Sequence, residues 1–122
     1  MKSSFSLKIN RKAILVVLSL MVIVMSHAVT FSIDELTYVT FSETAVEVFA
    51  RSQSITGSIE IPQTVKFDGV DYEVAGIGEN AFQGCTGLTE ISIPGSVIGI
   101  RPGAFQGCSS LSNVVIEDGG GT

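Results

Sequence analysis

The sequence predicts a mainly β protein in which an N-terminal β-hairpin region leads into a short solenoid with small helical or 3-10 turns. The main observation is a repeat, because the phrase Ala-Phe-Gln-Gly-Cys occupies residues 81–85 and returns unchanged at residues 104–108. The apolar residues on both sides of the phrase keep the same spacing, while the polar residues vary. A fixed period in the twenties with apolar positions in phase is typical of coils that stack on one another.

The first 28 residues differ in composition from the rest and are predicted to be a signal peptide, cleaved after Ala28. Lys and Arg residues precede an apolar run at residues 13–25, and Ser26-His27-Ala28 offers small residues at the positions that signal peptidase reads. A membrane anchor is the alternative, but it needs about 20 apolar residues to cross the hydrocarbon layer. The run is shorter than that. We therefore expect no membrane span after cleavage, and a secreted or cell-surface location.

Residues 29–122 are strongly acidic. They hold all 12 Asp and Glu residues but only three basic ones, Arg51, Lys66 and Arg101, so their net charge is −9. This charge repels nucleic acids and anionic membranes, so neither is an expected partner. The only histidine lies in the predicted signal peptide, and the commonest general base and zinc ligand is thus missing from the rest. We expect no catalytic residues, no metal and no cofactor.

The segment 29–57 is predicted to be an entry region built on a β-hairpin. Residues 36–41 and 45–50 are rich in β-branched and aromatic side chains, and the polar sequence Ser-Glu-Thr separates them. Residues 52–57 are polar and end with a glycine, which favours a connection to the segment that follows.

The repeats are predicted to occupy residues 58–118, and the first repeat carries an insertion. The sequence Ile-Glu-Ile-Pro at 59–62 corresponds to Ile-Ser-Ile-Pro at 91–94, but the two lie nine residues further apart than the period allows. The extra length corresponds to residues 66–74. This segment contains Asp68-Gly69 between alternating runs, which is a strong hairpin signal. We therefore expect a β-hairpin inserted in the first repeat, since terminal repeats are commonly atypical.

Each repeat divides into a strand and a turn. The pattern Leu-x-x-Ile-x-Ile ends in an alternation that predicts a strand with one buried face. The phrase Ala-Phe-Gln-Gly-Cys predicts a short helical or 3-10 turn, with Phe82 or Phe105 inside and a glycine at the end of the turn. One strand and one turn per period predict parallel strands about 4.8 Å apart.

The combined pattern Ile-x-Ile-Pro-x-Ser-Val-x-x-Ile-x-x-x-Ala-Phe-x-Gly-Cys-x-x-Leu resembles the BspA-type leucine-rich repeat of bacterial and protist surface proteins. The resemblance covers about residues 59–116. Two departures concern the last copy, where Glu117 stands in place of the proline, and residues 119–122, which are predicted to be a flexible end without a capping element. Because family members usually carry more repeats, the chain resembles an N-terminal piece of a longer array or a short member.

The resemblance implies a non-catalytic binding module, secreted or on the cell surface, that acts in adhesion or protein–protein interaction. It implies an extracellular protein as the partner, such as a host matrix protein. In a regular stack the outward positions of the strands form an extended face. The candidate partner-binding residues are the outward positions of the two clear copies: Thr89, Glu90, Ser92, Ser112, Asn113 and Val115.

Two other functions remain open. The chain could be a structural N-terminal cap of a truncated array, with no binding activity of its own, because fewer than three repeats rarely form a self-sufficient stack. The more remote alternative is a small secreted hydrolase that uses a pair of carboxylates, such as Asp71 and Glu73 on one face of a strand.

Cys85 and Cys108 hold the same position in successive coils, so their Cα atoms could lie within the span of a disulfide. An exported protein reaches a compartment that permits one. Parallel coils, however, direct both Cβ atoms the same way, and this geometry favours two buried free thiols over a disulfide. Two thiols without histidine are also too few for a zinc site.

Overall fold

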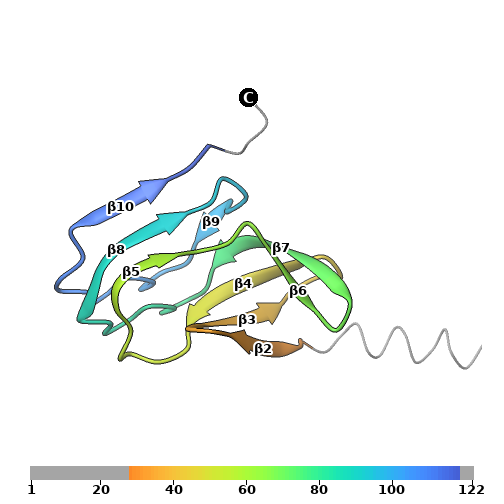
Figure 1. Cartoon of the computed structure of the whole chain (residues 1–122), viewed down its shortest axis with the longest axis horizontal. Helices are drawn as coiled ribbons and strands as arrows, with labels where there is room; N and C mark the ends of the chain where they lie inside the picture. The colour runs from red at the N-terminus through yellow and green to blue at the C-terminus, as the bar shows by residue number, and fades with distance from the viewer. Residues whose placement is uncertain (1–27, 119–122) are drawn as a thin grey trace, which may run out of the picture.

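The structure is a computed structural model and describes residues 28–118. The predicted signal peptide, except for Ala28, and the predicted flexible end at 119–122 lie outside these residues. Within residues 28–118 the chain forms two sheets (Figure 1), whose strands in chain order are β2 (Thr30–Ile33), β3 (Leu36–Thr40), β4 (Ala45–Ala50), β5 (Thr56–Glu60), β6 (Thr64–Phe67), β7 (Val70–Ile77), β8 (Gly87–Ile93), β9 (Gly99–Ile100) and β10 (Asn113–Ile116).

One sheet contains three parallel strands in the order β10-β8-β5, formed by the Leu-x-x-Ile-x-Ile part of each repeat. Ile59 and Val114 both align with Ile91, so equivalent residues of successive coils lie side by side. The inward side chains of β8, including Leu88 and Ile93, are at most 2% exposed. The predicted stack of parallel strands is confirmed.

The other sheet has the order β2-β3-β4-β7-β6, and β9 also pairs with β7. Strands β4, β7 and β9 are parallel to one another. The prediction of one strand per repeat is therefore wrong, because β7 and β9 give the first two coils a second strand on the opposite side of the core. Strand β9 consists only of Gly99–Ile100, which is too short to produce a periodic signal in the sequence.

The entry region is a three-stranded antiparallel unit. The predicted hairpin is confirmed as β3 and β4, and β2, which the sequence did not reveal, pairs with the other edge of β3. Phe31 of β2 stacks on Tyr38 with ring centroids 5.4 Å apart, and on Phe67 of β6 at 4.3 Å. The aromatic rings thus attach β2 to the same core as the repeats.

The insertion in the first repeat is a hairpin of β6 and β7. Asp68 and Gly69 connect the strands with φ angles of 53° and 79°, the positive pair that a type I′ turn requires. Lys66 and Asp71 are paired across the hairpin and form an ion pair of 2.7 Å. Strand β7 then continues to Ile77 between β4 and β9, so the insertion lengthens a strand of the coil.

The repeated phrase forms a hydrogen-bonded turn, and the described residues contain no helix, including none long and apolar enough to span a membrane. The Cys85 amide donates to the carbonyl oxygen of Phe82, and Cys108 does the same with Phe105, both at 3.1 Å. These bonds span three residues, as in a 3-10 helix, and each copy makes others of the same kind, such as Gln83 to Asn80 at 3.1 Å. They do not start at consecutive residues, so the segment is a series of turns, with Gly84 and Gly107 at positive φ angles of 77° and 79°.

The core lies between the two sheets and is continuous from β2 to β8. Phe82 is fully buried and stacks on Phe105 of the next coil, with ring centroids 5.5 Å apart and planes at 10°. The last coil is less covered. Val114 and Ile116 of β10 repeat the buried Ile91 and Ile93, yet they are 48% and 70% exposed.

Candidate functional site

The outer face of the three-stranded sheet carries the residues that the sequence singled out. Alternation along a strand sends Glu90 and Ser92 outward while Ile91 between them points into the core. The pairing of β5 with β8 shifts by one residue next to Gly57, so Thr89 is an extra residue in β8 and is exposed. All six predicted residues are exposed or half-buried: Thr89, Glu90, Ser92, Ser112, Asn113 and Val115.

The stacking arranges these side chains in two rows across the sheet. One row contains Ser58, Glu90 and Asn113, and the Asn113 amide nitrogen donates a hydrogen bond of 2.9 Å to the Glu90 carboxylate. The other row contains Glu60, Ser92 and Val115. Because each row takes one residue from each coil, it brings together positions that are 23 or more residues apart in the chain.

Hydrogen bonds fix further members of the face. The Ser92 hydroxyl donates to the Glu117 carboxylate at 2.8 Å, and the Ser112 amide donates to the Thr89 carbonyl oxygen at 3.0 Å. Glu117, which the sequence marked only as a departure from the repeat pattern, thus becomes part of this surface. A side chain held by a hydrogen bond loses less conformational entropy when a partner binds.

Sequence reasoning missed the two contributions of β5, Ser58 and Glu60. The signal was present, since Ile-Glu-Ile-Pro at 59–62 corresponds to Ile-Ser-Ile-Pro at 91–94 and places Glu60 at the position of Ser92. We call the complete set, predicted and added, the strand face: Ser58, Glu60, Thr89, Glu90, Ser92, Ser112, Asn113, Val115 and Glu117.

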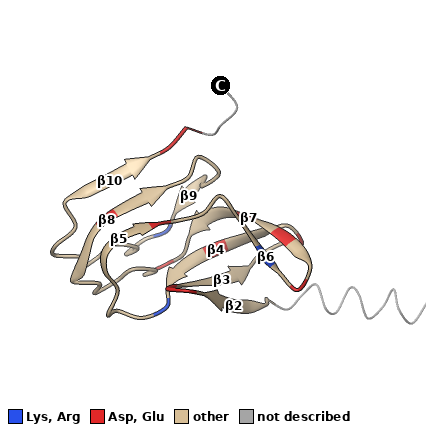
Figure 2. Cartoon of the chain, viewed as in Figure 1, with Lys and Arg blue, Asp and Glu red and all other residues tan. Residues whose placement is uncertain are grey.

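The strand face is acidic. Its three charged side chains, Glu60, Glu90 and Glu117, are all carboxylates (Figure 2). The three basic residues of the described segment lie elsewhere and have partners there. Arg101 pairs with Glu47, Lys66 with Asp71, and Arg51 donates to the carbonyl oxygen of Asp34. The face therefore presents a negative potential to any partner.

The two cysteines are free thiols in the structure. The Cys108 thiol donates to the Phe82 carbonyl oxygen at 3.0 Å, and Cys85 is fully buried. Burial raises the pKa of both thiols above the ordinary value, and the neighbouring Cys108 adds to the rise at Cys85. A raised pKa reduces the thiolate fraction and hence the nucleophilicity of both thiols. The expectation of two buried thiols holds for Cys85, whereas Cys108 is half-buried at the edge of the core.

Of the two carboxylates in the hydrolase alternative, Asp71 and Glu73, the first takes part in a structural ion pair. Asp71 is paired with Lys66 across the β6–β7 hairpin, 2.7 Å away. Within the described segment no three His, Cys, Asp or Glu side chains are grouped so that they could hold a metal ion.

Comparisons with known proteins agree with this geometry. A family model described as "BspA type Leucine rich repeat region (6 copies)" matches residues 42–120. No curated protein matches the chain significantly. Among solved structures, a leucine-rich repeat protein from Bacteroides ovatus is 38% identical with a TM-score of 0.62, covering 73% of this chain and 24% of that one.

Two further structures are similar. A leucine-rich repeat protein from Bacteroides capillosus is 30% identical with a TM-score of 0.60, covering 72% of this chain and 65% of that one. A leucine rich cell surface protein from Faecalibacterium prausnitzii shares the fold at 24% identity and a TM-score of 0.61, covering 75% and 24%. The chain thus spans about a quarter of the first and third of these proteins. The matches show that the chain belongs to the BspA-type leucine-rich repeat family.

Proposed function

We propose that this protein is a non-catalytic module that binds an extracellular protein through the strand face. The observation that carries the proposal is the pair of side-chain rows across β5, β8 and β10, which lie over a sheet whose inner side is packed. A rigid sheet that displays variable polar side chains at fixed spacing can match a partner without rearranging. Leucine-rich repeats are a family of such interaction modules.

The predicted signal peptide supports an exported protein, either secreted or held at the cell surface. The family resemblance supports adhesion to a host matrix protein as the biological role. The acidic strand face favours a basic patch on the partner, because complementary charges speed encounter and penalise wrong partners.

The test measures binding of the full chain to immobilised matrix proteins, namely fibronectin, laminin and collagen. A double variant, Glu90→Gln with Asn113→Ala, removes one charge and the hydrogen bond at the centre of the strand face. The control, Glu43→Gln with Gln106→Ala, makes the same kinds of change at exposed positions outside it. We expect the first variant to lose binding about tenfold, as a desolvated charged contact is worth more than 1 kcal/mol.

Unchanged circular dichroism must accompany the loss, so that it reports on the surface and not on folding. If the control loses as much binding as the strand-face variant, the effect is general charge attraction and the assignment of the face is wrong. If no matrix protein binds at all while longer family arrays do, adhesion by this chain is refuted.

The exposure of Val114 and Ile116 favours a second candidate, a structural cap for further coils. These side chains occupy core positions of the repeat, but no coil formed by residues 28–118 covers them. This candidate predicts marginal stability for the chain, and a cooperative thermal transition well above ambient temperature would count against it. Further in-frame repeats downstream in the nucleotide sequence would support it.

A further inference from the structure

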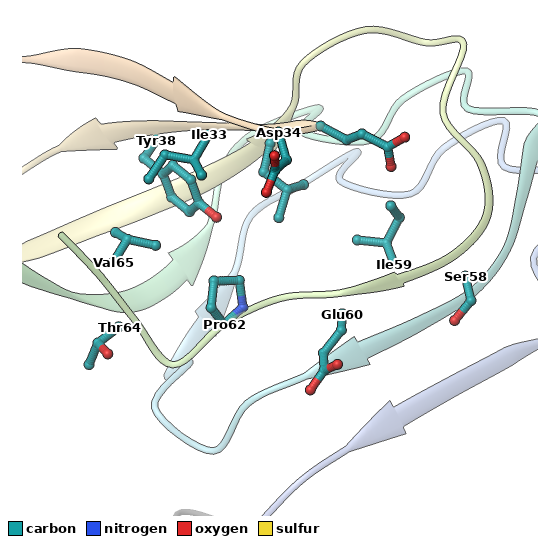
Figure 3. A pocket seen from close by; sticks show the side chains of 11 residues that line it. Ile33, Asp34, Tyr38, Ser58, Ile59, Glu60, Pro62, Thr64 and Val65 are labelled. Atoms are coloured by element: carbon teal, nitrogen blue, oxygen red, sulfur yellow. The ribbon is translucent and has the colours of Figure 1, made fainter. Parts of the chain in front are cut away.

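A hollow of about 790 Å³ lies between the β2–β3 turn and strands β5 and β6 (Figure 3). Its walls are mostly apolar and come from segments that are distant in the sequence: Ile33 and Leu36 beside the turn, and Ile59, Pro62 and Val65 across from them. Hollows of this size that combine apolar walls with a few polar groups are common binding sites.

A buried hydroxyl points into this hollow. Tyr38 is only 2% exposed, and its oxygen is directed into the space between Asp34 and Pro62 (Figure 3). No residue between 28 and 118 forms a hydrogen bond with it. Burial and then the charge of Asp34 raise the pKa of Tyr38 to about 12, so the group stays a neutral phenol that can donate and accept. A buried polar group without a partner is costly, and a ligand that bonds to it recovers that cost.

The charged groups around the hollow are all carboxylates. Asp34 and Glu35 form the turn at its edge, and Glu60 borders it where it meets the strand face. None of the three takes part in an ion pair within the described segment. The two cations on the neighbouring segments have other partners, since Arg51 donates to the Asp34 carbonyl oxygen and Lys66, next to Val65, pairs with Asp71. These carboxylates repel an anionic ligand, and a cation on an apolar stem fits the hollow.

The backbone beside the hollow is also unpaired. Strand β5 pairs with β8 on one side, and no described strand pairs with its other edge. In Figure 3 the Ile59 side chain extends from β5 toward the hollow, on the side of β5 that faces away from β8. An extended peptide can add to such an edge through main-chain hydrogen bonds while its side chains enter adjacent pockets.

From these observations we infer that the hollow and the free edge of β5 bind an extended basic segment of a partner protein. A lysine or arginine of that segment enters the hollow. Its aliphatic stem packs on Leu36, Ile59 and Pro62, its cationic end lies between the Asp34 and Glu35 carboxylates, and an N–H donates to the Tyr38 hydroxyl. The flanking backbone pairs with β5. This site goes beyond the strand face and does not depend on its proposed role.

The test titrates the full, ¹⁵N-labelled chain with a blocked peptide, Ser-Val-Lys-Val-Ser, and follows the backbone amide signals of Leu36 and Ile59 by NMR. One comparison peptide has norleucine in place of lysine, which keeps the stem and removes the charge. A second has both valines N-methylated, which prevents pairing with β5. We expect millimolar binding of the lysine peptide and at least about fivefold weaker binding of both others, since each loses about 1 kcal/mol of contact.

Protein variants separate this site from the general acidity of the chain. Asp34→Asn removes the charge at the hollow, and Asp68→Asn makes the same change at a turn residue with nearly the same φ, 53° against 54°, away from the hollow. We expect Asp34→Asn to weaken the lysine peptide about fivefold and Asp68→Asn to leave it within twofold. The inference is overturned if both variants act equally, if norleucine binds as well as lysine, or if N-methylation has no effect.

Discussion

The two copies of Ala-Phe-Gln-Gly-Cys allow the same substitution to be compared in two environments. Phe82 is fully buried under the next coil, whereas its equivalent Phe105 is only half-buried because no described coil covers it. Replacing a buried Phe by Ala costs about 3 to 5 kcal/mol, and the cost falls with the area that was buried. We expect Phe82→Ala to lower the free energy of unfolding by about 4 kcal/mol and Phe105→Ala by about 2 kcal/mol.

Urea unfolding of the full chain, followed by circular dichroism, measures this difference. With a slope of about 1.5 kcal/mol per molar urea, the midpoint falls by roughly 2.7 M for Phe82→Ala and roughly 1.3 M for Phe105→Ala. The pair also shares a stacking contact of 5.5 Å, so the double variant should lose about 1 kcal/mol less than the sum of the single losses. If Phe82→Ala fails to fold, leucine at each position gives the same comparison with smaller losses. Equal losses at the two positions, or a larger one at Phe105, would refute the reasoning.

Three further outcomes follow from single contacts. In urea unfolding, Gly84→Ala should destabilise the chain by more than the roughly 1 kcal/mol expected for Gly69→Ala. Both glycines have positive φ, but only at Gly84 would the added Cβ displace a side chain, that of Gln53, whose amide nitrogen donates a hydrogen bond of 2.9 Å to the Gln83 carbonyl oxygen. The free energy of unfolding should fall as pH rises from 10 to 12, because Tyr38 loses its proton near pH 10 in the unfolded chain and near pH 12 in the folded chain. Tyr38→Phe should make the free energy of unfolding less dependent on pH in this range. Iodoacetamide at pH 8 should alkylate Cys108 faster than the fully buried Cys85 in the native chain, and equal native rates, measured by mass spectrometry, would contradict the packing.

Prediction from the sequence succeeded where the structure depends on local or periodic information. The Asp68-Gly69 dipeptide specifies its own turn, and β6 and β7 form the corresponding hairpin. The Leu-x-x-Ile-x-Ile spacing specifies which side chains of β8 enter the core. Both signals are contained in a few consecutive residues, so they survive without knowledge of the rest of the chain.

Prediction failed where an element is short or depends on a distant partner. Strand β9 has two residues and exists because Gly99 and Ile100 pair with β7, a strand of the preceding coil. The ion pair of Glu47 and Arg101 joins residues 54 positions apart, and no period relates them. The predicted 3-10 turn is present as hydrogen bonds that span three residues, but these bonds do not start at consecutive residues, so the segment is a series of turns and not a helix.

By itself, the sequence determined the repeat period, the family and the positions that face outward, because stacked coils impose one pattern on every copy. Only the tertiary structure decided what lies beside those positions. It added Ser58, Glu60 and Glu117 to the strand face and placed the Asp34 turn across the hollow from β5. The two copies of Ala-Phe-Gln-Gly-Cys are identical in sequence, yet the structure buries Phe82 more fully than Phe105. The physical reason is that burial, pairing and electrostatic potential depend on neighbours in space, which stacking brings together from segments that share no local signal.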